Sequence, residues 1–396
     1  MNTDNKKLSA EIQKELIRIL SYWETYTLDY ENGGFYGTIN YDNVPDKKSE
    51  RSVVVTSRIL WTFSMAYRFL KNKKYLAIAE RAEHYLFNHF RDEKYGGVYW
   101  SVTAKGEPIE TKKQLYGHSF AIYGLSEYYA ATKSKPALDF AKAIFERIDK
   151  EGFDSEKGGY FECFTRDWSQ TDDYILSKPP YNKSMNTHLH LLEAFTNLYR
   201  VWPDPKLRFR TESVLSMMLD NIIDQNTHRE RLFFDKNWQP KDYTISYGHD
   251  IEASWLICEA AEVLGNEEVI KRVGERSVKM AVATLEGLAK DGMLNYEFDP
   301  VTKHLNTDRS WWVMAEQMVG FMNAYQLSKQ EHFWQKTLTT WEFIKKYQRD
   351  MVNGDWHAIV KADLTIPKTS KVNPWKGPYH HSRACFEMIK RLNKLL

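Results

Sequence analysis

The stretch NGGFYG, residues 32–37, places two glycines directly before two aromatic residues. Related turns recur as YGGVYW (95–100), KGGYFE (157–162), RLFFDKNW (231–238), GMLNYEF (292–298) and GDWHAIV (354–360). Anchored on Gly34, Gly97, Gly159, Phe233, Met293 and Asp355, the six turns are 63, 62, 74, 60 and 62 residues apart. The third step is longer because residues 167–183 add a proline-containing loop. A period near sixty across the whole chain predicts six structural repeats.

Two helical segments lie between successive turns, which gives six hairpins and twelve main helices. The first segments of the hairpins are rich in Lys, Glu and Arg, and they begin near Leu8, Tyr75, Pro136, Lys206, Glu267 and Glu331. The second segments are more apolar, and they begin near Ser52, Leu115, Met185, Gly248, Ser310 and Pro378. We therefore predict an outer ring that faces water and an inner ring that is buried.

The predicted fold is an all-α (α/α)6 barrel of six helical hairpins, with short β-like turns at the rim, in a single domain spanning residues 1–396. An open solenoid of hairpins is the alternative, because it uses the same local contacts. We favour closure because the inner segments are apolar on more than one face and neither terminal pair resembles a polar cap. In this arrangement the glycine turns lead the chain out of each outer helix through positive φ.

Composition narrows the class of partner. Lys and Arg total 55 against 53 for Asp and Glu, and no run of like charge suits nucleic acid, so we expect a small neutral ligand. The three cysteines are far apart and lack C-x-x-C spacing, which indicates a reducing compartment and no structural zinc. The N-terminal segment is typical of an amphipathic helix and not of a signal peptide, and no apolar run is long enough for a membrane span. These features predict a cytoplasmic protein, and we favour a monomer over a dimer.

Polar residues gather where the inner segments begin. Because every inner helix would start at the same end of the barrel, these side chains would border one cavity. Six of the twelve histidines fall in these windows, a higher density than core packing predicts. The residues are Arg58, Tyr116, His118, Asn186, His188, His190, His249, Glu252, Trp312, Glu316, His380, His381 and Arg383.

Helical spacing separates structural from functional candidates among these residues. Asn186 and His190, and likewise Trp312 and Glu316, are four residues apart, while His249 and Glu252 are three apart, so each pair shares a helix face. We favour His249, His190 and His380 as functional, and we expect His118, His188 and His381 to be structural. Glu252 is expected to orient His249 and tune its basicity, although a first-turn carboxylate stabilised by the helix dipole is the simpler alternative. The histidines lack a metal-binding motif, so no metal is predicted.

The inner segments carry a resemblance that covers nearly the whole chain. The blocks SRILWTFS, YGHSFAIYGLSEYY, MNTHLHLLEAFTNLY, SYGHDIEASWLICEAAE, RSWWVMAEQMVGF and NPWKGPYHHSRACFEMI resemble the N-acylglucosamine 2-epimerase superfamily, most closely the branch that acts on cellobiose. The resemblance implies an (α/α)6 barrel that works without a metal or redox cofactor. It also implies that the catalytic residues are His249, His380, His190, Arg58 and Glu252. The residues that it implies around the sugar are Tyr116, Asn186, Trp312, Glu316 and Trp375.

Two positions depart from the family pattern, which tends to have Asn after the catalytic histidine and Cys before the proline of the last block. Here these positions are His381 and Gly377. His380 and His381 are therefore both candidates for the catalytic residue, and we favour His380 because it follows Pro-Tyr.

The implied reaction is inversion at C2 of the reducing-end glucose in a β-1,4-linked disaccharide such as cellobiose. The ring opens, one base removes the C2 proton to give an enediolate, and a second base returns a proton to the opposite face. Histidine suits both roles near neutral pH. The alternatives are an aldose–ketose isomerase acting on mannose or glucose, an N-acylglucosamine 2-epimerase, a glycoside hydrolase with paired carboxylates, and a scaffold of helical hairpins without catalytic activity.

Overall fold

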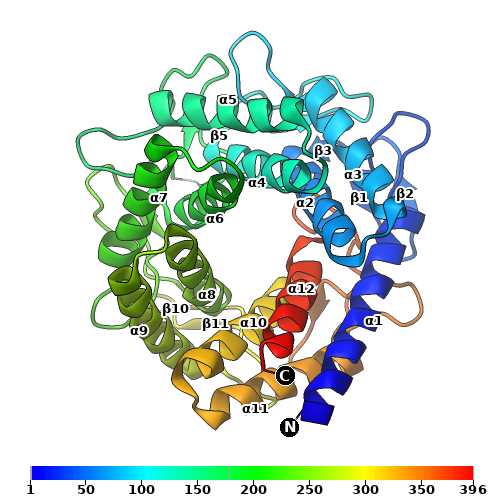
Figure 1. Cartoon of the computed structure of the whole chain (residues 1–396), viewed down its shortest axis with the longest axis vertical. Helices are drawn as coiled ribbons and strands as arrows, with labels where there is room; N and C mark the ends of the chain where they lie inside the picture. Colours follow the sequence, from blue (N-terminus) through cyan, green and yellow to red (C-terminus); the bar gives the residue numbers. More distant parts are fainter. Residues whose placement is uncertain (1, 178, 396) are drawn as a thin grey trace.

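The computed structural model describes residues 2–177 and 179–395, and Figure 1 shows two concentric layers of helices around one axis. The outer helices are α1 (Asn2–Tyr26), α3 (Lys73–Tyr85), α5 (Lys135–Glu151), α7 (Pro205–Met217), α9 (Glu267–Thr284) and α11 (Glu331–Phe343). The inner helices are α2 (Val53–Leu70), α4 (Leu115–Thr132), α6 (Met185–Val201), α8 (Tyr247–Leu264), α10 (Trp311–Ser328) and α12 (Tyr379–Asn393). The predicted all-α (α/α)6 barrel, with its alternation of outer and inner helices, is confirmed.

The ring is closed between its first and last repeats. Helix α1 packs against α12, so the first outer helix covers the last inner helix (Figure 1). At the rim, Ile39 forms an antiparallel bridge with Val372, and the Ile39 N–H donates to the Val372 carbonyl at 3.0 Å. The open solenoid is therefore wrong for this chain.

Short antiparallel ladders join neighbouring repeats at the rim. In each ladder, residues just before one inner helix pair with residues in or just after the next glycine–aromatic turn, so the first five inner helices begin at one end of the barrel. The pairs are β3 (Arg51–Ser52) with β4 (Ser101–Val102), β5 (Lys113–Gln114) with β6 (Cys163–Phe164), β7 (Lys183–Ser184) with β8 (Phe233–Phe234), β9 (Ile245–Ser246) with β10 (Glu297–Asp299), and β12 (Arg309–Ser310) with β13 (Ile359–Val360). Two hairpins add β1 (Thr38–Ile39) on β2 (Pro45–Asp46) and β11 (His304–Asn306) on β10.

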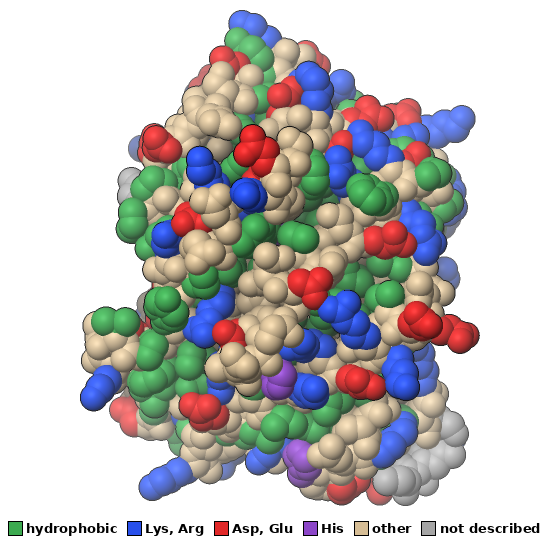
Figure 2. All heavy atoms as spheres, turned by 90° about the vertical axis from the view of Figure 1, so that its left-hand side faces the viewer, with side chains coloured by type: hydrophobic (Ala, Val, Ile, Leu, Met, Phe, Trp, Pro, Cys, Tyr) green, Lys and Arg blue, Asp and Glu red, His purple; other side chains and the backbone are tan. Residues whose placement is uncertain are grey.

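Burial follows the two layers. Helix α4 is buried continuously from Leu115 to Tyr128 because it packs between neighbouring inner helices and an outer one. Helix α5 buries only the stripe that includes Phe140, Ile144 and Ile148, at the spacing of one helix face. Figure 2 shows acidic and basic side chains interspersed over one side of the ring. In the part of the chain that the structure describes, no helix combines the length and hydropathy of a membrane span.

The glycine turns have the predicted backbone conformation, and they explain two of the histidines. Gly97 and Gly159 have φ of +73° and +76°, which glycine adopts without strain. A Cβ on Gly97 would lie 2.4 Å from His118 Nε2, and that nitrogen accepts a hydrogen bond from the Val98 N–H at 3.0 Å. His188 Nε2 likewise accepts from the N–H of the residue after Gly159, at 2.9 Å. The glycines thus let an inner-helix histidine bind the turn backbone.

Candidate active site

A cavity of about 470 Å³ opens at the end of the barrel where the inner helices begin. Its wall includes all the predicted catalytic and sugar-contacting residues except Glu316. The lining residues are Arg58, Tyr116, Asn186, His190, His249, Glu252, Tyr296, Asn306, Asp308, Ser310, Trp311, Trp312, Ala358, Ile359, Thr369, Asn373, Trp375 and His380. Side chains that are distant in the sequence therefore converge on one space, as the repeat predicted.

Three histidines face this cavity with the same nitrogen free. Nδ1 of His380 is 2.7 Å from Glu316 Oε1, and Nδ1 of His190 is 3.0 Å from Glu193 Oε2. Nδ1 of His249 is 2.7 Å from the hydroxyl of Ser246, the residue before α8. Within residues 2–177 and 179–395, no protein group is hydrogen-bonded to Nε2 of these three rings. Each ring is thus oriented through Nδ1 and leaves Nε2 available to a ligand.

His249 and His380 both lie close to one indole. The ring of Trp312, from α10, is 4.8 Å from that of His249 on α8 and 5.7 Å from that of His380 on α12. Because α8, α10 and α12 are consecutive inner helices, the two imidazoles reach the cavity from different parts of its wall. Trp312 is 8% exposed, so the contact is largely shielded from water.

Burial keeps these imidazoles neutral. It lowers the pKa of His249 to about 3 and lowers the pKa of His190 as well. Burial, reinforced by the positive charges of Arg58 and Arg383, holds the pKa of His380 well below its usual value. Neutral imidazoles are proton acceptors, so the cavity presents bases at neutral pH.

A buried ionic cluster supports the histidines from behind. Arg383, which is 2% exposed, donates to Glu252 Oε1 at 2.5 Å, to Glu316 Oε1 at 2.7 Å and also to Glu193. The cation and the bond from His190 keep the pKa of Glu193 low, at about 2, despite burial. Burial and the neighbouring Glu316 instead raise the pKa of Glu252.

This cluster changes the expectation for both predicted carboxylates. Glu252 forms no hydrogen bond with His249, whose Nδ1 is bonded to Ser246. It binds Arg383 and lies 3.8 Å from Nδ1 of His380. Glu316 does not line the cavity, because one of its oxygens accepts from His380 and Arg383 and the other accepts from Trp255 Nε1 at 3.0 Å. Same-face spacing on one helix did not reveal these bonds, since the partners come from α8 and α12.

Arg58 provides a positive charge at the cavity wall. Its guanidinium donates to the hydroxyl of Tyr116 at 3.0 Å and to the main-chain carbonyl of Trp375 at 2.7 Å. It also lies over the face of Phe120, 4.3 Å from the ring centroid. Its Nε is buried and has no hydrogen-bond partner in the described chain. Asn186 Oδ1, from another residue that lines the cavity, is likewise buried without a partner there.

Sequence reasoning did not assign a role to Glu193, Ser246, Tyr379 or Arg383. Glu193 was detectable, because it follows His190 by three residues on one helix face. Arg383 was among the polar residues at the helix starts, but its role depends on three carboxylates from three other helices. His381 binds Asp355 Oδ1 through Nε2 at 2.8 Å and is fully buried, as expected of a structural residue.

One group of side chains has the composition of a metal site. Ligand atoms of Glu252, Glu316 and His380 lie within 4.8 Å of one another. The Arg383 guanidinium donates to both carboxylates, and His380 donates to one of them, so these acceptors already have cationic or N–H partners. The donor set therefore fits the guanidinium and not an added metal ion.

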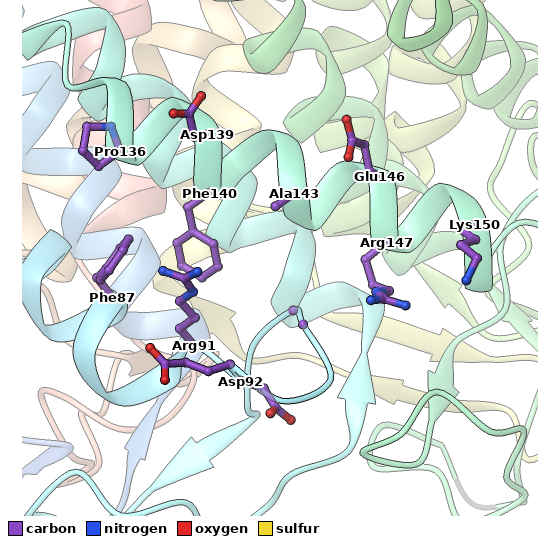
Figure 3. Close-up of a pocket in the computed structure, with 13 residues that line it drawn as sticks. Phe87, Arg91, Asp92, Pro136, Asp139, Phe140, Ala143, Glu146, Arg147 and Lys150 are labelled. Carbon is purple, nitrogen blue, oxygen red and sulfur yellow. The ribbon is translucent and has the colours of Figure 1, made fainter.

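A second hollow, of about 530 Å³, lies on the outside of the ring between α5 and the turn that follows α3 (Figure 3). Arg91 covers the rings of Phe87 and Phe140 there, at 4.8 and 5.4 Å from their centroids. Its wall mixes acidic and basic side chains such as Asp139 and Arg147 and contains no histidine. Of these two spaces, only the inner cavity joins bases, a cation and aromatic faces.

The sequence of residues 34–384 matches the family described as N-acylglucosamine 2-epimerase (GlcNAc 2-epimerase). The chain belongs to this family. It is 44% identical to the cellobiose 2-epimerase of Bacteroides fragilis over 96% of this chain and 98% of that protein. It is 38% identical to the cellobiose 2-epimerase of Dictyoglomus turgidum over 98% of this chain and 100% of that protein. The solved structure of cellobiose 2-epimerase from Bacillus thermoamylovorans superposes with a TM-score of 0.94 at 38% identity, covering 98% of this chain and 100% of that one.

Proposed function

We propose that this protein inverts C2 of the reducing-end glucose in a β-1,4-linked disaccharide such as cellobiose, giving the mannose-ended epimer. The observation that carries the proposal is the pair His249 and His380, whose rings border one cavity from two helices with Nε2 unbonded in the described chain. The similarity to the cellobiose 2-epimerases supports the choice of reaction and substrate class.

In this mechanism the open-chain aldehyde makes the C2 proton acidic. One neutral imidazole removes that proton through Nε2 and later releases it to solvent. The other imidazole takes up a proton from solvent and delivers it to C2 on the opposite face. Glu316 stabilises the cationic form of His380 through the 2.7 Å bond to Nδ1. Burial raises the pKa of both Glu252 and Glu316, so it opposes two full negative charges beside His380.

The negative charge of the enediolate needs donors in a site that excludes water. Arg58 and Tyr116 are adjacent at the cavity wall, and His190 is held in place by Glu193. Loss of one donor of this kind costs about a hundredfold or more in rate. We assign these residues, with Asn186, to the reacting end of the sugar.

Trp375 is assigned to the second ring. Its indole is 44% exposed and lies 5.9 Å from Trp100 and 6.1 Å from Tyr116, at the outer part of the cavity. An exposed aromatic face suits the apolar face of a pyranose, as does Trp312 nearer the histidines. Such a site binds a neutral disaccharide without needing net charge in the protein.

Incubation with cellobiose in heavy water tests this proposal, with products read by NMR and mass. A mannose-ended disaccharide carrying deuterium at C2 is the expected product. A ketose would instead indicate an aldose–ketose isomerase, and free glucose a hydrolase. Parallel reactions with glucose, mannose and an N-acylglucosamine test the substrate class, and the His249→Asn/His380→Asn double variant controls for contaminating activity.

A further inference from the structure

The last repeat contains an insertion before its inner helix. In four earlier repeats a basic residue of the rim ladder is followed by one residue and then the helix; these basic residues are Arg51, Lys113, Lys183 and Arg309. In the last repeat, residues 372–378 separate Lys371 from α12. Lys371 keeps the rim position, since its Nζ is 2.6 Å from Asp350 Oδ2, just as Lys113 Nζ is 2.8 Å from Asp92 Oδ2. Residues 372–378, here the Trp375 loop, are therefore an addition to the repeat.

This loop contacts Arg58 with its backbone. The carbonyl of Trp375 accepts from Arg58 Nη1 at 2.7 Å. Gly377 lies against the stem of the same arginine, since a Cβ built on Gly377 would be 3.6 Å from Arg58 Cβ. The indole of Trp375 meanwhile lines the outer cavity. The same loop thus orients the cation proposed to stabilise the enediolate and presents the surface proposed for the second ring.

Lys376, between these two contacts, anchors the loop. It is fully buried and paired with Asp355, which is fully buried as well. Its Nζ also donates to the Lys371 carbonyl at 3.0 Å, and the other oxygen of Asp355 binds His381. Removal of one partner from a buried ion pair leaves an uncompensated charge, so the pair resists displacement of the loop.

Asp355 occupies a position that takes glycine in the first three turns. Its φ is +56°, in the left-handed region, where Gly34, Gly97 and Gly159 are found in those turns. A side chain in this conformation is uncommon, and here its carboxylate bonds only to Lys376 and His381 among the described residues. The pair and the insertion therefore occur together in the repeat that carries His380.

We propose that Lys376, through its buried pair with Asp355, is a positioning residue that holds the Trp375 carbonyl against Arg58. It acts on turnover through Arg58, whereas the Trp375 indole acts on binding of the second ring. This inference rests on the proposed function, because it assigns its effects to steps of that reaction.

The test compares Lys376→Met with Lys113→Met. Both lysines are fully buried, and each pairs with a buried aspartate: Lys113 with Asp92 and Lys376 with Asp355. In each variant the aspartate keeps a second partner, which is Arg166 for Asp92 and His381 for Asp355. Both variants should lower the midpoint of thermal unfolding. Lys376→Met should also lower kcat for cellobiose by on the order of a hundredfold, while Lys113→Met keeps it. Equal kcat values for the two folded variants would overturn the proposal.

Trp375→Ala provides the complementary measurement, because it removes the indole and keeps the backbone carbonyl. Its KM for cellobiose should rise by up to about tenfold with kcat retained. If Lys376→Met does not fold, Asp355→Asn weakens the same pair and should shift kcat in the same direction, and an unchanged kcat in that variant would refute the inference. Failure of the wild-type protein to epimerise cellobiose would instead refute the proposed function.

Discussion

Replacing either proposed base should separate proton exchange from inversion. In His380→Asn and in His249→Asn, the surviving histidine can still remove and return a proton on its own face of the sugar. Net epimerisation needs both faces, so both variants should lose it. We assign the C2 proton of the glucose epimer to His380, so His249→Asn should still exchange deuterium into cellobiose and His380→Asn into the mannose-ended epimer.

The expected loss of inversion follows from what each substitution removes. In His380→Asn, the amide nitrogen of the new side chain occupies about the place of Nδ1, so the bond to Glu316, 2.7 Å in the wild type, can persist while Nε2 is lost. Loss of a general base lowers the rate by about 10²- to 10⁴-fold, which corresponds to about 3 to 5 kcal/mol of activation free energy. Both rings are neutral in the folded protein, so no buried charge is left unpaired and the fold should lose only about 1 kcal/mol.

The assay incubates each variant with each epimer in heavy water and follows deuterium at C2 by NMR. Circular dichroism and thermal unfolding confirm that the variants remain folded. Inversion by either single variant near the wild-type rate would refute the two-base assignment. Exchange into both epimers by one variant would also refute it, since a single histidine would then reach both faces.

Three further outcomes are expected. Treatment with EDTA should leave activity unchanged. In the described chain the only group with the spacing of metal ligands is Glu252, Glu316 and His380, and Arg383 already binds both of its carboxylates. Loss of activity that a divalent ion restores would contradict this. Gly97→Ala should lower the free energy of unfolding in urea by well over the ~1 kcal/mol that left-handed backbone strain costs, because the new Cβ meets His118. Gly265→Ala is the control: Gly265 has φ +74° and no atom within 4 Å of a built Cβ, so this variant should lose only the ~1 kcal/mol of strain. The difference in unfolding free energy between wild type and His188→Gln should depend on pH, because burial lowers the pKa of His188 to about 4. Below about pH 6.5 the unfolded state binds a proton that the folded state does not, so the stability advantage of wild type should shrink by about 1.4 kcal/mol per pH unit until about pH 4. A difference that stays constant with pH would contradict this.

The fold was predictable because its information is local and repeated. The turn spacing near sixty residues and the two kinds of helical segment defined six hairpins. Glycines such as Gly97 marked the positive-φ turns. A helix face needs only residues three and four apart, so the apolar stripe of α5 and the continuous burial of α4 could be read directly from the chain.

The location of the cavity was predictable for the same reason. Every inner helix begins at one rim, so polar residues in their first turns had to meet, and His190, His249 and His380 do line one space. His118 and His188 were expected to be structural residues. His118 and His188 recur at the same helix position and bind the glycine turns, as a structural repeat requires.

The partners of these residues were decided only by the tertiary structure. Spacing suggested that Glu252 supports His249, and the family resemblance implied that Glu316 contacts the sugar. In the structure Arg383 from α12 binds both carboxylates, and Glu316 lies behind the cavity wall, where it binds His380. Sequence periodicity reports which face of a helix a side chain occupies, whereas hydrogen bonds between helices depend on their relative height and rotation in the closed ring. Those quantities are fixed by packing around the whole barrel, so the sequence by itself determined which side chains meet, and the closed ring determined which of them are bonded.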